Sequence, residues 1–120
     1  MPRVLVIDDS ENIRNCLGMT LQFKNCEVRE ASDGVKGLAA IEAEDFDLVF
    51  CDLAMPGLNG EELIRRVRKD LEKHDLPIII LSAEDRQAKD AAMAAGANDC
   101  IDKPFRPDAV LEALEKYTAS

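Results

Sequence analysis

Five polar side chains that could carry chemistry come at the ends of short segments with the pattern of strands. They are the carboxylates of Asp8, Asp9 and Asp52, the hydroxyl of Ser82 and the ammonium of Lys103. Short apolar segments are typical of strands that are buried on both faces of a parallel sheet. Because the carboxyl ends of parallel strands meet at one edge, we expect the five side chains to converge there. One such residue alone is more simply a helix cap or a solvated loop residue, but five together favour a site.

Three carboxylates around one cleft need more positive charge than Lys103 supplies. Two carboxylates about 4 Å apart repel each other by about 4 kcal/mol at an effective dielectric constant of about 20. A divalent cation removes this conflict. Oxygen ligands without a neighbouring His or Cys suit Mg²⁺, with Mn²⁺ as an alternative, whereas Ca²⁺ prefers a richer set of ligands. The sequence also lacks the twelve-residue calcium loop.

These groups are the parts needed to transfer a phosphoryl group to Asp52. An ionised carboxylate is a known covalent nucleophile and needs no separate base. The metal and Lys103 would neutralise the phosphoryl oxygens, and Ser82 would donate a hydrogen bond to the product. Neither the Gly-x-Gly-x-x-Gly motif nor the P-loop motif of nucleotide sites is present. The donor is therefore expected to be a partner protein or a small phosphorylated compound.

Apolar strand patterns alternate with amphipathic helix patterns five times along the chain. The expected strands are Val4–Ile7, Cys26–Ala31, Leu48–Cys51, Pro77–Leu81 and Asp99–Asp102. The expected helices begin near Ser10, after a cap at Ser32 or Asp33, after a cap at Asn59, near Asp85 and near Pro107. We expect the second helix to bury Val35, Leu38 and Ile41, the third to end near His74 before Pro77, and the fourth to end at Ala95 before Gly96.

Strict alternation of this kind indicates a parallel sheet with helices on both faces. The first, third and fourth strands are solidly apolar and should be central, whereas the second and fifth are half polar and should lie at the edges. This predicts the strand order 2-1-3-4-5 of a flavodoxin-like, doubly wound α/β fold with a five-stranded parallel sheet. The length of 120 residues fits a single domain over residues 1–120.

Composition and charge exclude several classes of partner. A net charge of -9, from 24 acidic and 15 basic residues, argues against direct binding to nucleic acid or to an anionic membrane. The longest aliphatic runs are about four residues, so we expect no membrane insertion, and the N-terminus has no signal-peptide pattern. We therefore expect a cytoplasmic protein. The four widely spaced cysteines are expected to be small buried side chains in a reducing compartment.

Five motifs in order resemble the receiver domain of two-component response regulators, in particular the single-domain receivers of chemotaxis. They are Asp8-Asp9, Asp52 with Met55-Pro56-Gly57 and Gly60, Ser82-Ala83, Gly96-Ala97 before Asp99, and Lys103-Pro104-Phe105. The resemblance covers essentially the whole chain.

The resemblance implies a role for each of the five polar residues at the strand ends, which together form the rim of the site. Asp52 would accept a phosphoryl group from a sensor histidine kinase or a histidine phosphotransfer protein. Asp9, Asp52 and the backbone carbonyl of Ala54 would bind Mg²⁺ directly, and Asp8 would act mainly through water. Ser82 and Lys103 would hold the phosphoryl group. The family also suggests a cis peptide bond between Lys103 and Pro104.

One position departs from the family pattern. Many receivers carry Tyr or Phe three residues before the lysine, and this chain has Cys100 there. A cysteine can neither fill the volume of a ring nor present a phenol to a partner, as the usual aromatic switch requires. We expect the face made by the fourth helix, fifth strand and fifth helix still to carry the output, to a downstream protein or to a covalently attached output domain.

Two other functions compete with phosphorylation signalling. An aspartyl phosphatase of the haloacid dehalogenase type also uses an aspartate and Mg²⁺, but it would need Asp-x-Asp after its first strand and a cap segment for the substrate. A non-phosphorylated interaction module would usually lack part of the acidic set or the lysine, and here all are retained. His74, the only histidine, is expected on the surface, on the opposite side of the sheet from the acidic rim.

Overall fold

Strands and helices alternate along the chain in the computed structural model, which describes residues 1–83 and 86–118. The strands are β1 (Arg3–Ile7), β2 (Glu27–Ala31), β3 (Leu48–Asp52), β4 (Ile78–Ser82) and β5 (Asp99–Asp102). The helices are α1 (Glu11–Gln22), α2 (Gly34–Ala43), α3 (Gly60–Lys69), α4 (Arg86–Ala95) and α5 (Pro107–Thr118). Asp85, the expected start of the fourth helix, lies outside the described residues. None of the described helices is both long and apolar enough to cross a membrane.

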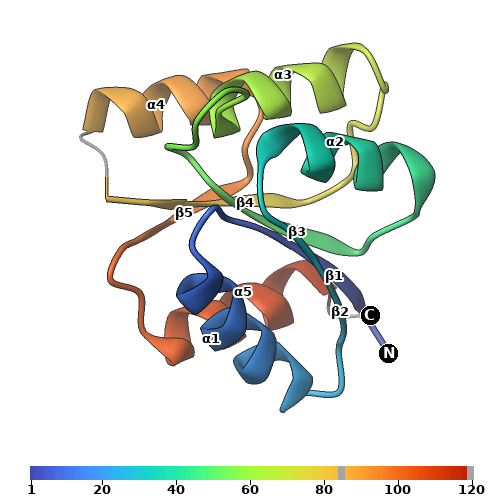
Figure 1. Ribbon diagram of the computed structural model, residues 1–120, viewed down its shortest axis with the longest axis vertical. Helices are drawn as coiled ribbons and strands as arrows, with labels where there is room; N and C mark the ends of the chain where they lie inside the picture. The colour runs from blue at the N-terminus through green and yellow to red at the C-terminus, as the bar shows by residue number, and fades with distance from the viewer. Residues whose placement is uncertain (84–85, 119–120) are drawn as a thin grey trace.

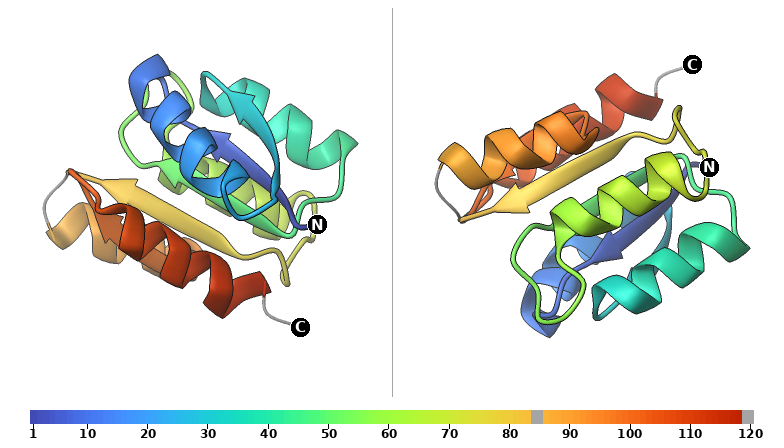
Figure 2. Two further views of the ribbon diagram at one scale, coloured as in Figure 1. Left: turned by 90° about the horizontal axis from the view of Figure 1, so that it is seen from below. Right: turned by 90° about the horizontal axis from the view of Figure 1, so that it is seen from above.

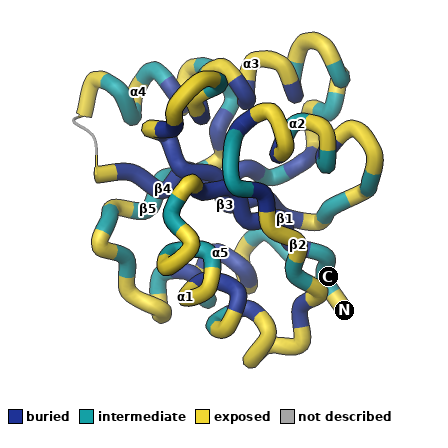
Figure 3. The backbone as a smooth tube through the Cα atoms, viewed as in Figure 1, coloured by how far each residue is buried: buried dark blue, intermediate teal, exposed yellow. Residues whose placement is uncertain are grey.

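All strand pairs of the sheet are parallel, and the strand order is β2-β1-β3-β4-β5 (Figure 1). This confirms the predicted flavodoxin-like order. Every residue of β3 and β4 is buried, whereas most of β2 is exposed and β5 is only partly covered. Figure 3 shows the same contrast between the central and the edge strands. Edge strands tolerate polar residues because one side of each faces solvent, which is why their sequences are mixed.

The helices cover the two faces of the sheet unequally. Helices α1 and α5 pack on one face, and α2, α3 and α4 pack on the other, as Figures 1 and 2 show. Successive residues of β3 point to opposite faces, so Phe50 belongs to the core under α1 and α5 while Cys51 belongs to the core under α2 to α4. The central strands are therefore held from both sides.

Three of the predicted helix starts are confirmed by their caps. The side chain of Ser10 accepts a hydrogen bond from the amide of Ile13 at the start of α1. Asp33 accepts one from Lys36 at the start of α2, at 2.7 Å, and Asn59 accepts one from Glu62 at the start of α3, at 2.9 Å. Each side chain satisfies one backbone N–H that the first helical turn leaves unpaired.

The predicted end of the third helix near His74 is wrong, because α3 ends at Lys69. The chain then turns back over the helix end, with Glu72 in the left-handed region at φ 55. The guanidinium of Arg68 donates hydrogen bonds to the carbonyls of Lys73 and Leu76, both at 2.7 Å. These carbonyls are satisfied by a side chain, so the segment before Pro77 needs no helical hydrogen bonds.

The expectation that Val35 faces the core is also wrong, because Val35 is 66% exposed. The buried residues of α2 are Gly34, Gly37 and Ile41. A Cβ atom on Gly37 would lie only 2.5 Å from the side chain of Ile7, so α2 approaches β1 too closely for a larger residue there. The close packing of the α2 backbone on the Ile7 side chain therefore turns Gly37 inward, together with the buried Ile41.

The cysteines divide between buried and open positions. Cys26 and Cys51 are buried as predicted, Cys100 is partly buried, and Cys16 is exposed, so the prediction fails at Cys16. Helix α1 turns Leu17 and Leu21 toward the sheet, and Cys16 lies on its outer side.

Two glycine substitutions test the close approach that positions Asp52. A Cβ atom on Gly60 would lie 2.7 Å from the backbone oxygen of Asp52, and neither backbone can move away cheaply. We expect Gly60→Ala to lower the free energy of unfolding by about 1–3 kcal/mol, as overpacking does. A Cβ atom on Gly18 in α1 meets nothing nearer than 4.0 Å, so Gly18→Ala is the matched control and should raise stability by about 0.5–1 kcal/mol. Urea unfolding measures the free energy of unfolding of both variants. Equal effects would contradict the close contact assigned to Gly60 and the backbone of Asp52.

Candidate functional site

The register of the sheet brings the predicted residues to one rim. Ile7 pairs with Cys51, so Asp8, just after β1, and Asp52, the last residue of β3, lie side by side at the carboxyl ends of the two strands. Asp52 pairs with Leu81, the residue before Ser82. Ser82 in turn pairs with Asp102, and the carbonyl of Ser82 accepts a hydrogen bond from the amide of Lys103 at 2.9 Å. The carboxyl ends of β1, β3, β4 and β5 therefore supply every member of the predicted set.

Lys103 joins the two buried carboxylates. Its Nζ lies 2.9 Å from Oδ2 of Asp8 and 3.1 Å from Oδ1 of Asp52. The relative exposure of Asp8 is 0% and that of Asp52 is 5%, so both carboxylates are almost completely removed from water. Burial lowers the pKa of Lys103, but its hydrogen bonds to Asp8 and Asp52 and their negative charges outweigh burial and leave the pKa raised. Lys103 is therefore charged wherever the two carboxylates are.

Asp52 is held in an unfavourable state as a carboxylate. Burial, followed by the negative charge of Asp8, raises the pKa of Asp52 above its ordinary value, although Lys103 and a hydrogen bond with the backbone of Ala54 oppose the shift. One ammonium does not compensate fully for two buried negative charges. The rim therefore retains a demand for further positive charge.

Asp9 completes a set of oxygen atoms that could hold a metal ion. Unlike Asp8 and Asp52, Asp9 is exposed. One carboxylate oxygen from each of the three lies within 4.8 Å of the others. The set contains no His and no Cys, which is the donor chemistry of a hard cation such as Mg²⁺.

The remaining predicted groups lie beside these carboxylates. Ser82 is 1% exposed at the end of β4, and Ala54 is exposed two residues after Asp52. The peptide bond between Lys103 and Pro104 is cis, as the resemblance suggested.

Sequence reasoning missed Arg14, which reaches the rim from α1. Its guanidinium donates a hydrogen bond to the backbone oxygen of Asp8 at 2.7 Å. The sequence feature that could have pointed to Arg14 is its position one turn into α1, a few residues after Asp8 and Asp9. That signal is weak, because an arginine in the first half of a helix is usually solvated.

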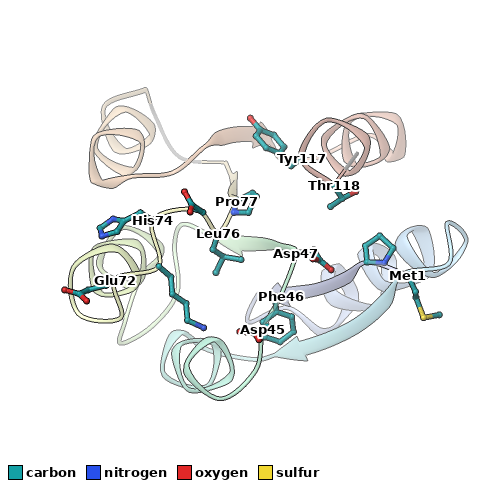
Figure 4. A pocket seen from close by; sticks show the side chains of 13 residues that line it. Met1, Asp45, Phe46, Asp47, Glu72, His74, Leu76, Pro77, Tyr117 and Thr118 are labelled. Carbon is teal, nitrogen blue, oxygen red and sulfur yellow. The ribbon is translucent and has the colours of Figure 1, made fainter. Parts of the chain in front are cut away.

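A separate hollow of about 810 Å³ lies at the opposite edge of the sheet, next to the amino ends of the strands. Figure 4 shows that its labelled side chains come from the N-terminus, the segment before β3, the segment before β4 and the end of α5. His74 is exposed and lies here, as predicted, although in a loop and not at a helix end. The hollow is open and brings none of the predicted site residues together.

Replacing Asp52 tests the electrostatic cost of the rim. Asp52→Asn, which leaves Lys103 its partner Asp8, should raise the free energy of unfolding in metal-free buffer at neutral pH. Because the pKa of Asp52 is raised on folding, wild-type stability falls as the pH rises from the ordinary carboxyl value of about 3.9 through the raised value. The advantage of Asp52→Asn should therefore shrink as the pH is lowered through that window. Urea unfolding with a chelator measures it, and a variant less stable than wild type at pH 7 would contradict this account.

Comparison with known proteins identifies the family to which this geometry belongs. A model of the response regulator receiver domain matches residues 4–115. The chemotaxis protein CheY homolog of Campylobacter jejuni is 36% identical over 116 residues, which cover 94% of this chain and 89% of that protein.

Other relatives are longer than this chain. The DNA-binding dual master transcriptional regulator RpaA of Synechocystis is 34% identical over 92% of this chain and 46% of its own length. The transcriptional regulatory protein ResD of Bacillus subtilis is 38% identical over 91% of this chain and 45% of its own length. The chain thus spans about half the length of these curated relatives.

Solved structures agree with the family model. The chemotaxis protein CheY4 of Vibrio cholerae superimposes with a TM-score of 0.90 at 35% identity, covering 98% of both chains. The response regulator TrrA of Thermotoga maritima, solved in complex with Mg²⁺-BeF, superimposes with a TM-score of 0.88 at 35% identity, covering 98% of this chain and 99% of that one. The chain belongs to the response regulator receiver domain family.

Proposed function

We propose that the chain accepts a phosphoryl group on Asp52, in a Mg²⁺-dependent transfer from a sensor histidine kinase or a histidine phosphotransfer protein. The observation that carries the proposal is the contact of Lys103 with Asp8 and Asp52 at 2.9 and 3.1 Å, beside the open carboxylate of Asp9. Phosphorylation then switches a protein-interaction surface.

The rim suits Mg²⁺ in its donor chemistry. Its carboxylate oxygens lie within 4.8 Å of one another, and a small octahedral ion needs ligand oxygens at about 2.0–2.1 Å from its centre, with water in the remaining positions. Asp9, Asp52 and the carbonyl of Ala54 would bind the ion directly, and Asp8 would act through water, with Mn²⁺ as an alternative ion. When bound, the ion supplies the positive charge that offsets the phosphoryl oxygens.

The chain's own residues account for the rest of the transfer. A carboxylate oxygen of Asp52 attacks phosphorus, an oxygen–phosphorus bond forms, and the phosphorus–nitrogen bond of the donor phosphohistidine breaks, leaving its electron pair on the imidazole. Lys103, already next to Asp52, moves its ammonium to a phosphoryl oxygen. The hydroxyl of Ser82 donates a hydrogen bond to another. Exclusion of water around these buried groups strengthens each interaction.

We propose the face of α4, β5 and α5 as the output surface. Lys103 directly follows β5, and Ser82 ends β4, which pairs with β5. Cys100 is partly buried in β5, and burial raises the pKa of its thiol, so it is a small uncharged side chain in the usual aromatic position. The signal is then expected to travel through Ser82 and the backbone of β5. The signal is passed on to a separate protein or to an attached output domain.

Phosphorylation by acetyl phosphate tests the acceptor. With Mg²⁺, the intact protein should gain the mass of one phosphoryl group, and a chelator should abolish the gain. Asp52→Asn should gain nothing. The matched control Asp90→Asn, which changes an exposed aspartate on α4 whose side chain is 71% exposed, should gain the group like wild type.

Other outcomes of the same experiment would replace the proposal. Sustained turnover of diverse phosphate esters would indicate an aspartyl phosphatase. No mass gain in the folded wild-type protein would indicate an interaction module that does not use phosphorylation.

Beryllofluoride with Mg²⁺ tests the output surface without a labile phosphoryl group. We expect backbone amide shifts in nuclear magnetic resonance spectra to change at Asp52, and also at Cys100 and along α4 and α5. Asp52→Asn should remove the changes. Shift changes that remain confined to the Asp52 rim would rule out this surface as the output.

A further inference from the structure

Every polar atom of Asp8 has a partner. Its amide donates to the carbonyl of Ala31 at 3.1 Å. Its Oδ1 accepts from the amide of Ser10 at 2.9 Å, and its Oδ2 accepts from Lys103 at 2.9 Å. Its backbone oxygen accepts from Arg14 at 2.7 Å. Asp8 is therefore held by four other residues, from the start of α1, the end of β2 and the residue after β5.

Arg14 connects this residue to the edge of the sheet. While one nitrogen of its guanidinium bonds to Asp8, Nε lies 3.2 Å from a carboxylate oxygen of Glu30 on β2. The Arg14 side chain is only 15% exposed. A planar guanidinium with two partners in fixed directions has little freedom to turn.

The contact between Arg14 and Asp8 acts on the peptide bond that leads to Asp9. The carbonyl of Asp8 and the amide of Asp9 belong to one planar unit, so fixing the oxygen fixes the direction in which Asp9 leaves the strand. Within the part of the chain that the structure describes, no group donates a hydrogen bond to the Asp9 carboxylate. Its position thus depends on its backbone.

We propose that Arg14 is a positioning residue for the metal site: together with Glu30, it orients the Asp8–Asp9 peptide so that the carboxylate of Asp9 faces Asp52. The inference rests on the proposed function, because it concerns the binding of Mg²⁺ to that rim. Groups that orient metal ligands from behind typically change metal affinity by about 10-fold to 100-fold when removed.

An electrostatic role and a positioning role of Arg14 predict opposite changes in Mg²⁺ affinity when Arg14 is removed. Removing a cation near three carboxylates makes the rim more negative, so electrostatics alone would tighten Mg²⁺ binding. If Arg14 positions the site, loss of its hydrogen bond frees the Asp8–Asp9 peptide and weakens Mg²⁺ binding. The sign of the change therefore separates the two explanations.

Calorimetric titration of the whole chain with Mg²⁺ tests the proposal. We expect Arg14→Ala to bind about tenfold more weakly than wild type. Arg14→Lys keeps the charge but cannot reach both partners with fixed geometry, so it should recover only part of the loss. Arg29→Ala is the control, because it removes the same charge from an exposed arginine on β2 that pairs with Glu44. Its affinity should equal that of wild type or be slightly higher.

Phosphorylation by acetyl phosphate gives a second readout. Arg14→Ala should need about ten times more Mg²⁺ for half of its maximal rate, yet should reach nearly the wild-type rate at saturating Mg²⁺. A merely structural role would lower the amount of active protein and leave the half-saturating concentration unchanged. Urea unfolding without Mg²⁺ shows how much of each variant is folded.

The outcomes are distinct. Affinity of Arg14→Ala equal to or higher than that of wild type would overturn the proposal. If Arg14→Ala does not fold, Arg14→Lys and Glu30→Gln decide, and wild-type affinity in both would overturn it equally. If the wild-type protein itself does not bind Mg²⁺, the result would instead contradict the proposed function.

Discussion

The structure depends on the balance of charge between Lys103 and the two carboxylates that it joins. Asp8 is fully buried and Asp52 nearly so, and a buried carboxylate without a partner costs several kcal/mol. One ammonium at 2.9 and 3.1 Å reduces this cost but cannot remove it. Three parallel strand ends must therefore meet within hydrogen-bonding distance, and the register of β1, β3 and β5 is constrained to bring them there. The same imbalance makes the rim receptive to a divalent cation.

Much of the fold could be predicted because the central strands are buried on both faces. Such strands have continuous apolar sequences, and the polar residue that ends each one is conspicuous, as Asp8, Asp52 and Ser82 are. Parallel strand ends share one edge, so the site followed from the order of the elements. The half-polar sequences of β2 and β5 similarly indicated the edges of the sheet.

The features that could not be predicted depend on contacts between segments far apart in the sequence. Val35 has the apolar side chain of a core residue, yet it is exposed. Helix α2 packs so closely on Ile7 that it turns Gly37, which has no Cβ atom, toward the sheet instead. The end of α3 depends on Arg68, which binds loop carbonyls that local sequence would assign to a helix. Arg14 is an ordinary helical arginine until Asp8 and Glu30 are placed beside it. Periodicity contains none of this information.

The position of β5 at the edge of the sheet links two events thermodynamically. Lys103 directly follows this strand, and among the strands that the structure describes β5 pairs with β4 alone. Any molecule that pairs with its open side, or packs over Cys100, contacts the strand that carries the ammonium. If such a molecule prefers one placement of Lys103 over another, then occupancy of Asp52 changes its affinity, and its binding changes the free energy of occupying Asp52 by the same amount. Under the proposed function, a target that binds at this edge would therefore also change how readily Asp52 is occupied.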